Sequence, residues 1–580
     1  MLRFSRALLA PYKKYLLLIV LFQTAQAFLT LYLPTLNAGI IDYGTVQGDM
    51  GYVMRVGCVM LVLSAIQFAC NIAGSVYGAR VAMLSGRDLR ERVYKKILSL
   101  SQREVAEFGA PTLITRATND TQQIVQFFLF LFTAVINALI MFVGGVCLAL
   151  SQNVRLSVVI LVTCPLLILI TVFFVRHIVP FYRKRQLGID ELNGVLRDQI
   201  TGMRVVRAFN KQDFEKRKLE DVNDRLFGIN LSIGYATALL VPLFTLIVSF
   251  SKIALMWLGG SMGTGGQVQI GVINAFVTYT SFILSATLME SMVFIQLPRA
   301  NVSADRLEEI LNTACSVTDG EGAIDVAPPA GAPLVFDHVS FSYAPDDPNV
   351  RKVLEDVSFA AYPGQTCAII GSTGSGKSTI VNLISRTANV TGGAIRWGDA
   401  DVRDMTLASY LRQVGIVPQK SYLFSGTLAQ NLRYAKKDAT DEELLEALRI
   451  AQARDFVLAS EGQLNMQVAE GGSNYSGGQR QRLCIARAIV RRPRIYLFDD
   501  SFSALDYATD QRLRAELAKT TKDAICLVVG QRIGSIKDAD QIVVMDEGHV
   551  AGVGTHEELL SSCEVYQQIV ASQEHRSERG

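Results

Sequence analysis

The sequence predicts two structural parts: an α-helical membrane domain with six spans, and a following α/β domain built on a substantially parallel sheet. Half of the 580 residues are hydrophobic, and the mean hydropathy of +0.28 is high for a soluble protein. The apolar residues gather into long stretches in the first half of the chain. The second half instead alternates short β-rich runs with helical patterns, which is typical of an α/β domain.

Six mainly apolar stretches are long enough, at ~20 residues or more, to cross a bilayer as helices. They cover about 15–36, 53–78, 127–150, 155–178, 237–259 and 270–295. Ala25-Gln26-Ala27 resembles a signal-peptide cleavage site. The apolar run continues to Leu36, however, and five more stretches follow. We therefore expect the first stretch to be retained as a span.

The basic residues of the loops predict the orientation. Lys and Arg are absent between Lys14 and Arg55 and within 259–269, but they crowd the loops before the third and fifth stretches. Because positive charge stays on the cytoplasmic side, both termini and the second domain are expected in the cytoplasm of a multi-pass protein of the cell membrane. A net charge of only +3 gives no reason to expect a nucleic-acid partner. The nine scattered cysteines favour free thiols over a disulfide framework or zinc site.

The domain boundaries follow from changes in composition. Helical patterns over Val81–Leu100 and Leu192–Phe227 predict helices that run out of the membrane, with turns near 104–111 and 210–216. After Pro298 the chain becomes more polar, with a polar-faced helix expected over 299–313. We expect a transmembrane domain at 1–313, a linker rich in Gly, Ala and Pro at 314–333, and the α/β domain at 334–580.

A glycine-rich segment predicts a phosphate-binding loop. It follows the apolar strand Cys367–Ile370 and opens a helix, the context that this motif requires. Glycines let backbone N–H groups surround phosphate oxygens, and the helix N-terminus adds positive dipole. Lys377 is expected on the β- and γ-phosphates and the Ser378 hydroxyl on Mg²⁺. The segment reads Gly371, Ser372, Thr373, Gly374, Ser375, Gly376, Lys377, Ser378 and Thr379.

A second apolar run, Ile495–Phe498, ends in two carboxylates, Asp499 and Asp500. An acidic pair directly after a buried strand is placed for chemistry more often than for solubility. Asp499 is expected to hold Mg²⁺, and Asp500 to orient an attacking water.

Further motifs give the chain a resemblance to the ABC ATPases. The run 474–482, with Ser476, Gly477, Gly478 and Gln479, resembles the ABC signature segment. Tyr343, Gln419, Glu470 and the stretch 503–506 stand where this family has further motif residues. The resemblance covers essentially the whole chain, and six spans with long cytoplasmic helices are similar to the exporter type.

The resemblance implies roles for these residues. Tyr343 would stack on adenine, Gln419 would sense Mg²⁺, Glu470 would contact the cytoplasmic loops, and residues 503–506 would cross the dimer. ATP and Mg²⁺ would lie between the phosphate loop of one chain and the signature of a second half-transporter chain. The family fold further implies membrane lipid around the chain and a small-molecule or lipid substrate, most often exported.

Two departures from the family pattern point to a degenerate ATP site. Asp500 stands where the family usually has Glu, and Gln531 where it usually has His. Tyr475 replaces the usual leucine beside an otherwise complete signature. The chain thus resembles the degenerate-site subunit of bacterial heterodimeric exporters of the multidrug type. A homodimer with two slow sites, and a regulatory or ATP-gated subunit, are the alternatives.

Two charges fall within the predicted spans. Lys252 could snorkel to the outer surface, and Glu290 could line a cavity open to the cytoplasm. Counted at about 1.5 Å per residue, their depths differ by roughly 20 Å, so they are not expected to pair.

Overall fold

A computed structural model describes residues 2–264, 268–325, 328–345, 347 and 349–577. By internal packing the chain divides into two compact units. The first comprises Met1–Leu98 and Pro111–Thr313, and the second comprises Ser99–Ala110 and Ala314–Gly580. The boundaries expected at 313/314 and 333/334 remain predictions.

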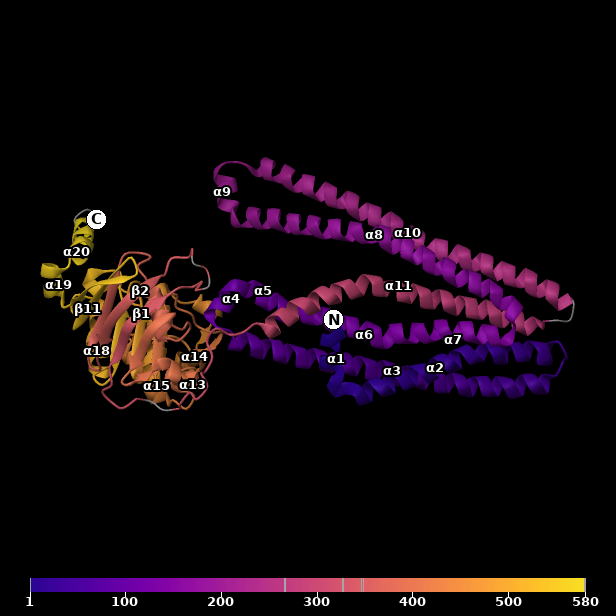
Figure 1. The fold of residues 1–580 in the computed structure, drawn as a ribbon, viewed down its shortest axis with the longest axis horizontal. Coiled ribbons are helices and arrows are strands. Elements are labelled where there is room, and N and C mark those ends of the chain that lie inside the picture. Colours follow the sequence, from indigo (N-terminus) through magenta and orange to yellow (C-terminus); the bar gives the residue numbers. More distant parts are fainter. Residues whose placement is uncertain (1, 265–267, 326–327, 346, 348, 578–580) are drawn as a thin grey trace. The chain divides into compact units, whose positions relative to one another are not determined.

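The first unit is built of long helices (Figure 1). Six of them are long and apolar enough to cross a membrane, which confirms the expected six spans. Turns of π-helix interrupt the helical path at Ile40–Thr45, Arg116–Asp120 and Leu131–Val135. The helices are α1 (Leu2–Leu9), α2 (Lys13–Gly39), α3 (Met50–Ser99), α5 (Ala110–Thr115), α6 (Thr121–Phe130), α7 (Ile136–Gln152), α8 (Val154–Thr201), α9 (Met203–Ala208), α10 (Gln212–Thr264) and α11 (Ile270–Asn312).

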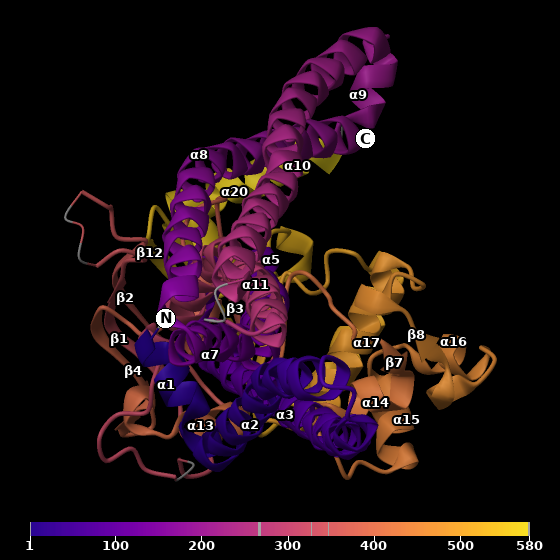
Figure 2. The ribbon, with the colours of Figure 1, turned by 90° about the vertical axis from the view of Figure 1, so that its right-hand side faces the viewer.

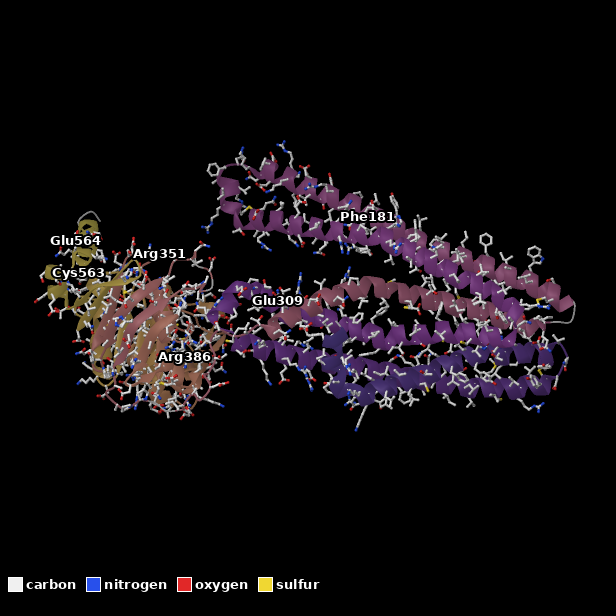
Figure 3. All side chains as sticks on the ribbon, in the orientation of Figure 1. Phe181, Glu309, Arg351, Arg386, Cys563 and Glu564 are labelled. Atoms are coloured by element: carbon white, nitrogen blue, oxygen red, sulfur yellow. The ribbon has the colours of Figure 1, made fainter. Side chains whose placement is uncertain are left out.

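The last span differs from expectation. We expected a separate polar-faced helix after Pro298, but α11 runs unbroken from Ile270 to Asn312 with Pro298 inside it. A proline removes one backbone hydrogen bond and bends a helix that packing holds on both sides. At the cytoplasmic end of α11, Glu309 pairs with Arg116 at 2.7 Å (Figure 3).

The α8–α10 hairpin forms one long arm of the first unit. Both helices lie side by side in two views and meet at the short α9 (Figures 1 and 2). The break falls at Gly202, and the reversal follows α9, where Asn210 has a positive φ of 52°. The sequence placed the reversal over 210–216, but α10 already begins at Gln212.

A buried carboxylate joins the first and last spans near their outer ends. Asp42, on the π-helical turn after α2, is 7% exposed. Its Oδ1 accepts a hydrogen bond from the backbone N–H of Gly271 at 2.7 Å. That N–H belongs to the first turn of α11, where no carbonyl of the same helix can accept it. A Cβ on Gly271 would stand 2.2 Å from the carbonyl oxygen of Ala38, so this contact requires glycine.

The second unit contains two main sheets. An antiparallel sheet has the order β2-β1-β4-β5, and a larger sheet has the order β12-β11-β3-β10-β9-β6. The strands are β1 (Leu334–Phe341), β2 (Leu354–Ala361), β3 (Thr366–Gly371), β4 (Gly392–Trp397), β5 (Ala400–Asp401), β6 (Val414–Val417), β9 (Ile495–Asp499), β10 (Ile525–Val529), β11 (Gln541–Asp546) and β12 (His549–Gly554), with a small pair β7 (Gly426–Thr427) and β8 (Gln467–Val468).

Five strands of the larger sheet are parallel, and only β12 pairs antiparallel. Helices cover this sheet, and α14–α17 form a helical part to one side of the β1–β2–β4 strands (Figure 2). Buried leucines, valines and alanines of the helical part share one core with Phe498 and Val528. The helices are α12 (Lys377–Ile384), α13 (Leu407–Arg412), α14 (Leu428–Arg433), α15 (Asp441–Ile450), α16 (Arg454–Leu458), α17 (Gly477–Val490), α18 (Tyr507–Thr520), α19 (His556–Ser562) and α20 (Glu564–Ser577).

The second unit also includes helix α4 (Gln102–Phe108), from the loop between spans two and three. The Ser101 side chain accepts from the backbone N–H of Glu104, and the Glu104 carboxylate accepts from the backbone N–H of Ser101. The two residues thus form a capping box at the start of α4. The Ser101 hydroxyl also lies 2.8 Å from that of Ser316. Burial alone would raise the pKa of Glu104, but hydrogen bonds from these two serines outweigh it and lower the pKa. The carboxylate therefore stays ionised although it is buried.

We predict that Asp42→Ala lowers the free energy of unfolding by about 1–3 kcal/mol, because it leaves the Gly271 N–H buried without a partner. Asp49→Ala is the matched control, since Asp49 is exposed and its Oδ1 accepts from the Tyr52 N–H at 3.0 Å. Its loss should cost about 1 kcal/mol or less. The measurement is the thermal unfolding midpoint of both full-length variants in one detergent. Equal shifts for the two variants would contradict the structural role of Asp42.

Candidate functional site

The parallel sheet brings four of the predicted site segments to one edge. The phosphate loop follows β3, Gln531 follows β10, Asp499 and Asp500 end β9, and Gln419 follows β6. These strands are neighbours in the order β3-β10-β9-β6 and run in the same direction. Their carboxyl ends therefore meet at one edge, the place where open α/β sheets bind ligands.

The phosphate loop has the backbone shape of an anion cradle. Gly374 and Gly376 adopt positive φ angles of 87° and 100°. A Cβ on Gly376 would stand 2.4 Å from Leu354 Cδ2, whereas one on Gly374 would meet nothing within 4 Å. Gly376 therefore serves packing as well as backbone shape. It directly precedes α12, whose first N–H groups have no helical acceptor.

Two side chains of the loop are prepared for an anion. The Ser375 hydroxyl is buried and has no hydrogen-bond partner among the residues that the structure describes. Lys377 Nζ donates to the carbonyl oxygens of Gly371 and Ser372, at 2.9 and 2.7 Å. These contacts hold the ammonium over the loop. Ser378 and Thr379 follow within α12, Ser378 exposed and Thr379 buried.

The charges of Lys377 and the acidic pair depend on one another. Burial lowers the pKa of Lys377, while the carboxylates of Asp499 and Asp500 raise it. Burial likewise raises the pKa of Asp499, Asp500 adds to that effect, and Lys377 opposes it. A partly buried cation next to two partly buried carboxylates is an arrangement suited to a divalent cation and a polyphosphate.

Asp500 has an unusual backbone angle, and one of its carboxylate oxygens already accepts a hydrogen bond. Its φ of 47° is unusual for a residue other than glycine. Its Oδ2 accepts a hydrogen bond from Gln531 Nε2 at 3.2 Å. Burial raises the pKa of Asp500, against a hydrogen bond from Gln419 and the positive charge of Arg532. The structure thus brings together the two residues at which the sequence departs from the family pattern.

Tyr343 lies over the start of α12. Its hydroxyl is 3.4 Å from the Thr379 hydroxyl and accepts from Asn382 Nδ2 at 3.4 Å. Phe341 supports the ring edge-on, with the ring centroids 4.8 Å apart. The Tyr343 side chain is still 46% exposed, which leaves a face free to stack on a planar group.

The signature segment forms the start of helix α17. Ser476 caps the helix, and its side chain accepts from the Gln479 N–H while Gln479 Oε1 accepts from the Ser476 N–H. Ser476 and Gly477 are exposed, and Gly478 lies close to the Ala504 carbonyl. The Tyr475 hydroxyl donates to Met466 Sδ at 2.8 Å, within the core of the helical part. Replacement of the usual leucine by Tyr475 therefore leaves the helix start intact.

The residues present fit ATP and Mg²⁺. The unpartnered Ser375 hydroxyl, the curled Lys377 and the first turn of α12 are a donor set for phosphate oxygens. Ser378, Gln419 and Asp499 offer the oxygen ligands that Mg²⁺ prefers. When bound, Mg²⁺ would neutralise charge between the phosphates. The assignment of individual ligands remains a prediction.

Two residues contact the site without having been predicted. Gln481, 4% exposed on α17, donates from Nε2 to the carbonyl oxygen of Asp500 at 3.3 Å. Ser501, fully buried, donates to the carbonyl oxygen of Val417 at 2.9 Å. Gln481 links the signature helix to the acidic pair, and Ser501 links β9 to β6. The sequence signal for Gln481 was its place inside the signature run, and for Ser501 its place directly after Asp500. Neither signal identifies the acceptor, because both acceptors are backbone atoms.

We predict that Gly376→Ala destabilises the chain by more than about 2 kcal/mol, since it combines backbone strain with a clash against Leu354. Gly374→Ala is the matched control. It carries the backbone strain alone, about 1–2 kcal/mol. Thermal unfolding of the full chain without nucleotide measures both. Similar midpoints for the two variants would show that the Gly376–Leu354 approach has no structural importance.

Comparison with known proteins agrees with this site and fold. Residues 16–288 match the ABC transporter transmembrane region, and 354–503 match the ABC transporter family model. An ABC transporter ATP-binding protein of Mycobacterium tuberculosis, itself uncharacterized, is 43% identical over 97% of this chain and 96% of its own length. A similarly named protein of Bacillus subtilis is 33% identical over 97% of both chains.

Two further comparisons give the fold of a solved structure and a longer relative. A bacterial Atm1-family ABC exporter with ATP bound has a TM-score of 0.81 at 23% identity, covering 98% of this chain and 99% of its own. A multidrug efflux ATP-binding/permease protein of M. tuberculosis is 29% identical over 94% of this chain but only 45% of its own length. The chain belongs to the ABC transporter family, as a membrane-spanning half-transporter that joins one transmembrane domain of the exporter fold to one cytoplasmic ATPase domain.

Proposed function

We propose that this chain is one subunit of a heterodimeric exporter, that its own ATP site hydrolyses poorly, and that its signature segment completes the partner's active site. The partner would be a second ABC half-transporter with Glu and His at the two positions where this chain has Asp500 and Gln531.

The hydrogen bond from Gln531 Nε2 to Asp500 Oδ2 carries this proposal. A carboxylate that activates a water must present a free oxygen toward it. Asp500 is one methylene shorter than Glu, and a misplacement of about 1 Å can cost roughly a hundredfold in rate. One of its oxygens is moreover engaged by Gln531, and the backbone at φ 47° limits its adjustment.

Nucleotide binding does not depend on those two residues. Lys377, Ser375 and the first turn of α12 supply cation and donors for phosphate oxygens, and Tyr343 supplies an exposed aromatic face. Gln531 can still donate its amide N–H to a γ-phosphate oxygen, but it cannot take up and release a proton as an imidazole does. The site is thus suited to holding ATP for long periods.

The signature segment has no such defect. The capping box of Ser476 and Gln479 fixes the start of α17, and both Ser476 and Gly477 are exposed. An exposed hydroxyl and N–H groups at the start of a helix attract an anion. In a head-to-tail pair, this surface would face the γ-phosphate bound by the partner.

The names of two relatives and the composition of the membrane domain support a proposed substrate class. One relative is named as a multidrug efflux protein, and the solved relative is an ABC exporter. Together with spans that are almost wholly apolar, this favours amphipathic small molecules or lipids as the transported substrate.

A homodimer with two slow sites remains the alternative, because the residues for nucleotide binding are complete. Flux into vesicles against a gradient would separate a transporter from an ATP-gated, regulatory subunit.

We predict that ATPase activity requires the pair. This chain would be purified alone and with the ABC half-chain encoded by the neighbouring gene. Activity of the pair should survive Asp500→Ala within about twofold, because the water is activated at the other site. The matching Glu→Gln in the partner should lower activity about a hundredfold or more, by removal of that site's base. Brisk turnover by this chain alone, abolished by Asp500→Ala, would establish a homodimer with a working Asp500.

We further predict that Ser476→Ala in this chain lowers the ATPase rate of the pair about tenfold or more, because the partner's site loses a phosphate donor. Thr440→Ala is the matched control. Thr440 caps α15 with the same type of capping box, away from the signature. Each substitution removes a helix cap and should lower the free energy of unfolding by about 1 kcal/mol, but only Ser476→Ala should lower the rate of ATP hydrolysis. If both variants reduce the rate equally, the effect is loss of stability alone.

A further inference from the structure

A short stretch of α8, residues 181–185, combines two aromatic rings with three cations. Lys184 Nζ lies 5.7 Å from the centre of the Phe181 ring. The Arg185 guanidinium carbon lies 4.5 Å from the centre of the Tyr182 ring. Each cation follows its ring by three residues, the spacing at which neighbours on one helix face meet. Phe181, on the α8–α10 arm, is 37% exposed, and Lys184 is exposed as well (Figure 3).

The contacts between α8 and α10 place this stretch just beyond the membrane. Thr163 lies opposite Ser251, with the hydroxyl oxygens 2.6 Å apart, and a Cβ on Gly188 would stand 3.2 Å from Leu226. At this register, the expected cytoplasmic ends of the fourth and fifth spans lie at one level. The stretch begins three residues beyond the end of the fourth span. It therefore lies about 5–10 Å past the apolar core, at the depth of the lipid headgroups.

The side chains of this stretch lean toward the membrane. The Cα–Cβ bonds of an α-helix tilt toward its N-terminus. Because α8 begins at the outer side of the membrane, Lys184 and Arg185 lean back over the two rings, toward the headgroups. Aromatic rings are favoured at this interface, where they anchor a helix.

Neither helix of the hairpin supplies a carboxylate to these cations. Asp and Glu are absent from residues 154–189 of α8 and from residues 226–264 of α10. The part of α10 that lies opposite the stretch, residues 229–233, is apolar or uncharged. The hairpin therefore presents positive charge at the level of the headgroups.

A second basic triplet on the same hairpin differs in each of these respects. Residues 216–218 lie near the start of α10, about 20 residues and hence about 30 Å beyond the expected end of that span. Asp213, Glu215 and Glu220 are close in sequence, and Lys216 pairs with Glu220 at 3.7 Å. At this distance, about three Debye lengths of ~10 Å, the charge of a membrane surface is screened.

We propose that residues 181–185 form a docking surface for the phosphate groups of anionic phospholipids in the cytoplasmic leaflet. Lys and Arg just outside a span attract the negative surface of that leaflet, and the attraction grows with each basic residue. The two rings add contact with the boundary between acyl chains and headgroups, which a soluble anion cannot offer. The lipid is a bound partner of the hairpin and not the transported substrate, so this inference is independent of the proposed function.

The test is native mass spectrometry of the full-length chain in detergent, titrated with phosphatidylglycerol or with phosphatidylcholine. Wild type should bind the first phosphatidylglycerol at least about tenfold more tightly than phosphatidylcholine. The triple variant Arg183→Gln, Lys184→Gln, Arg185→Gln should lose about tenfold in affinity for phosphatidylglycerol and keep its affinity for phosphatidylcholine. Tyr182→Ala removes only the ring beneath Arg185 and should show a smaller loss, of about threefold.

The matched control is the triple variant Lys216→Gln, Arg217→Gln, Lys218→Gln, which removes the same formal charge far from the membrane. It should bind phosphatidylglycerol within about twofold of wild type. Gln is a good helix former, so both triple variants should keep the hairpin folded. Equal losses in the two triple variants, or equal binding of the two lipids by wild type, would show that the proposal is wrong. Displacement of the lipid by inorganic phosphate would also overturn it, because the surface would then bind a soluble anion.

Discussion

The parallel pairing of β3, β10, β9 and β6 is the constraint on which the ATP site depends. Val529 pairs with both Ile369 and Asp499, and Val417 pairs with Phe498, so the strands end within about two residues of each other. The phosphate loop, Gln531, Asp500 and Gln419 then necessarily share one edge. A slip of one residue in any strand would turn its side chains to the opposite face of the sheet. The buried apolar residues on both faces exclude such a slip, so packing far from the ligand fixes the distances at the site.

Much of this arrangement could be predicted from the sequence, because local signals carry it. The phosphate loop lies between an apolar strand and a helix, the signature is a capping box before a helix, and the six spans follow from hydropathy. Continuation of α11 through Pro298 could not be predicted, since surrounding packing decides whether a proline ends a helix. The Asp42–Gly271 and Gln531–Asp500 bonds join residues that no local pattern relates.

Buried polar atoms without a partner occur in both units of the described chain. In the ATPase domain, Ser375 Oγ is buried without a partner beside the cation Lys377. In the membrane domain, Glu290 Oε1 on α11 is buried without a partner among the described residues. Some buried polar groups of the described chain are satisfied: Asp42 caps α11, Glu104 accepts from Ser101, and Tyr410 donates to the Ile384 carbonyl at 2.7 Å. Others are not, among them Gln152 Oε1 and Asn301 Oδ1. An unsatisfied buried atom therefore indicates a ligand only where other groups support it, as Lys377 and the first turn of α12 do for the Ser375 hydroxyl.

The separation of binding from hydrolysis within one chain has a structural basis. The exposed signature is stabilised locally by Ser476 and Gln479, and its helix is tied to Asp500 through the backbone carbonyl that Gln481 holds, not through the Asp500 carboxylate. A change in the Asp500 or Gln531 side chain therefore leaves the signature helix and its link to the sheet unchanged. Loss of a catalytic base need not weaken either the binding of ATP here or the surface offered to a partner. A subunit can thus lose hydrolysis at its own site while it keeps the ATP-binding residues and the signature segment that a paired transporter requires.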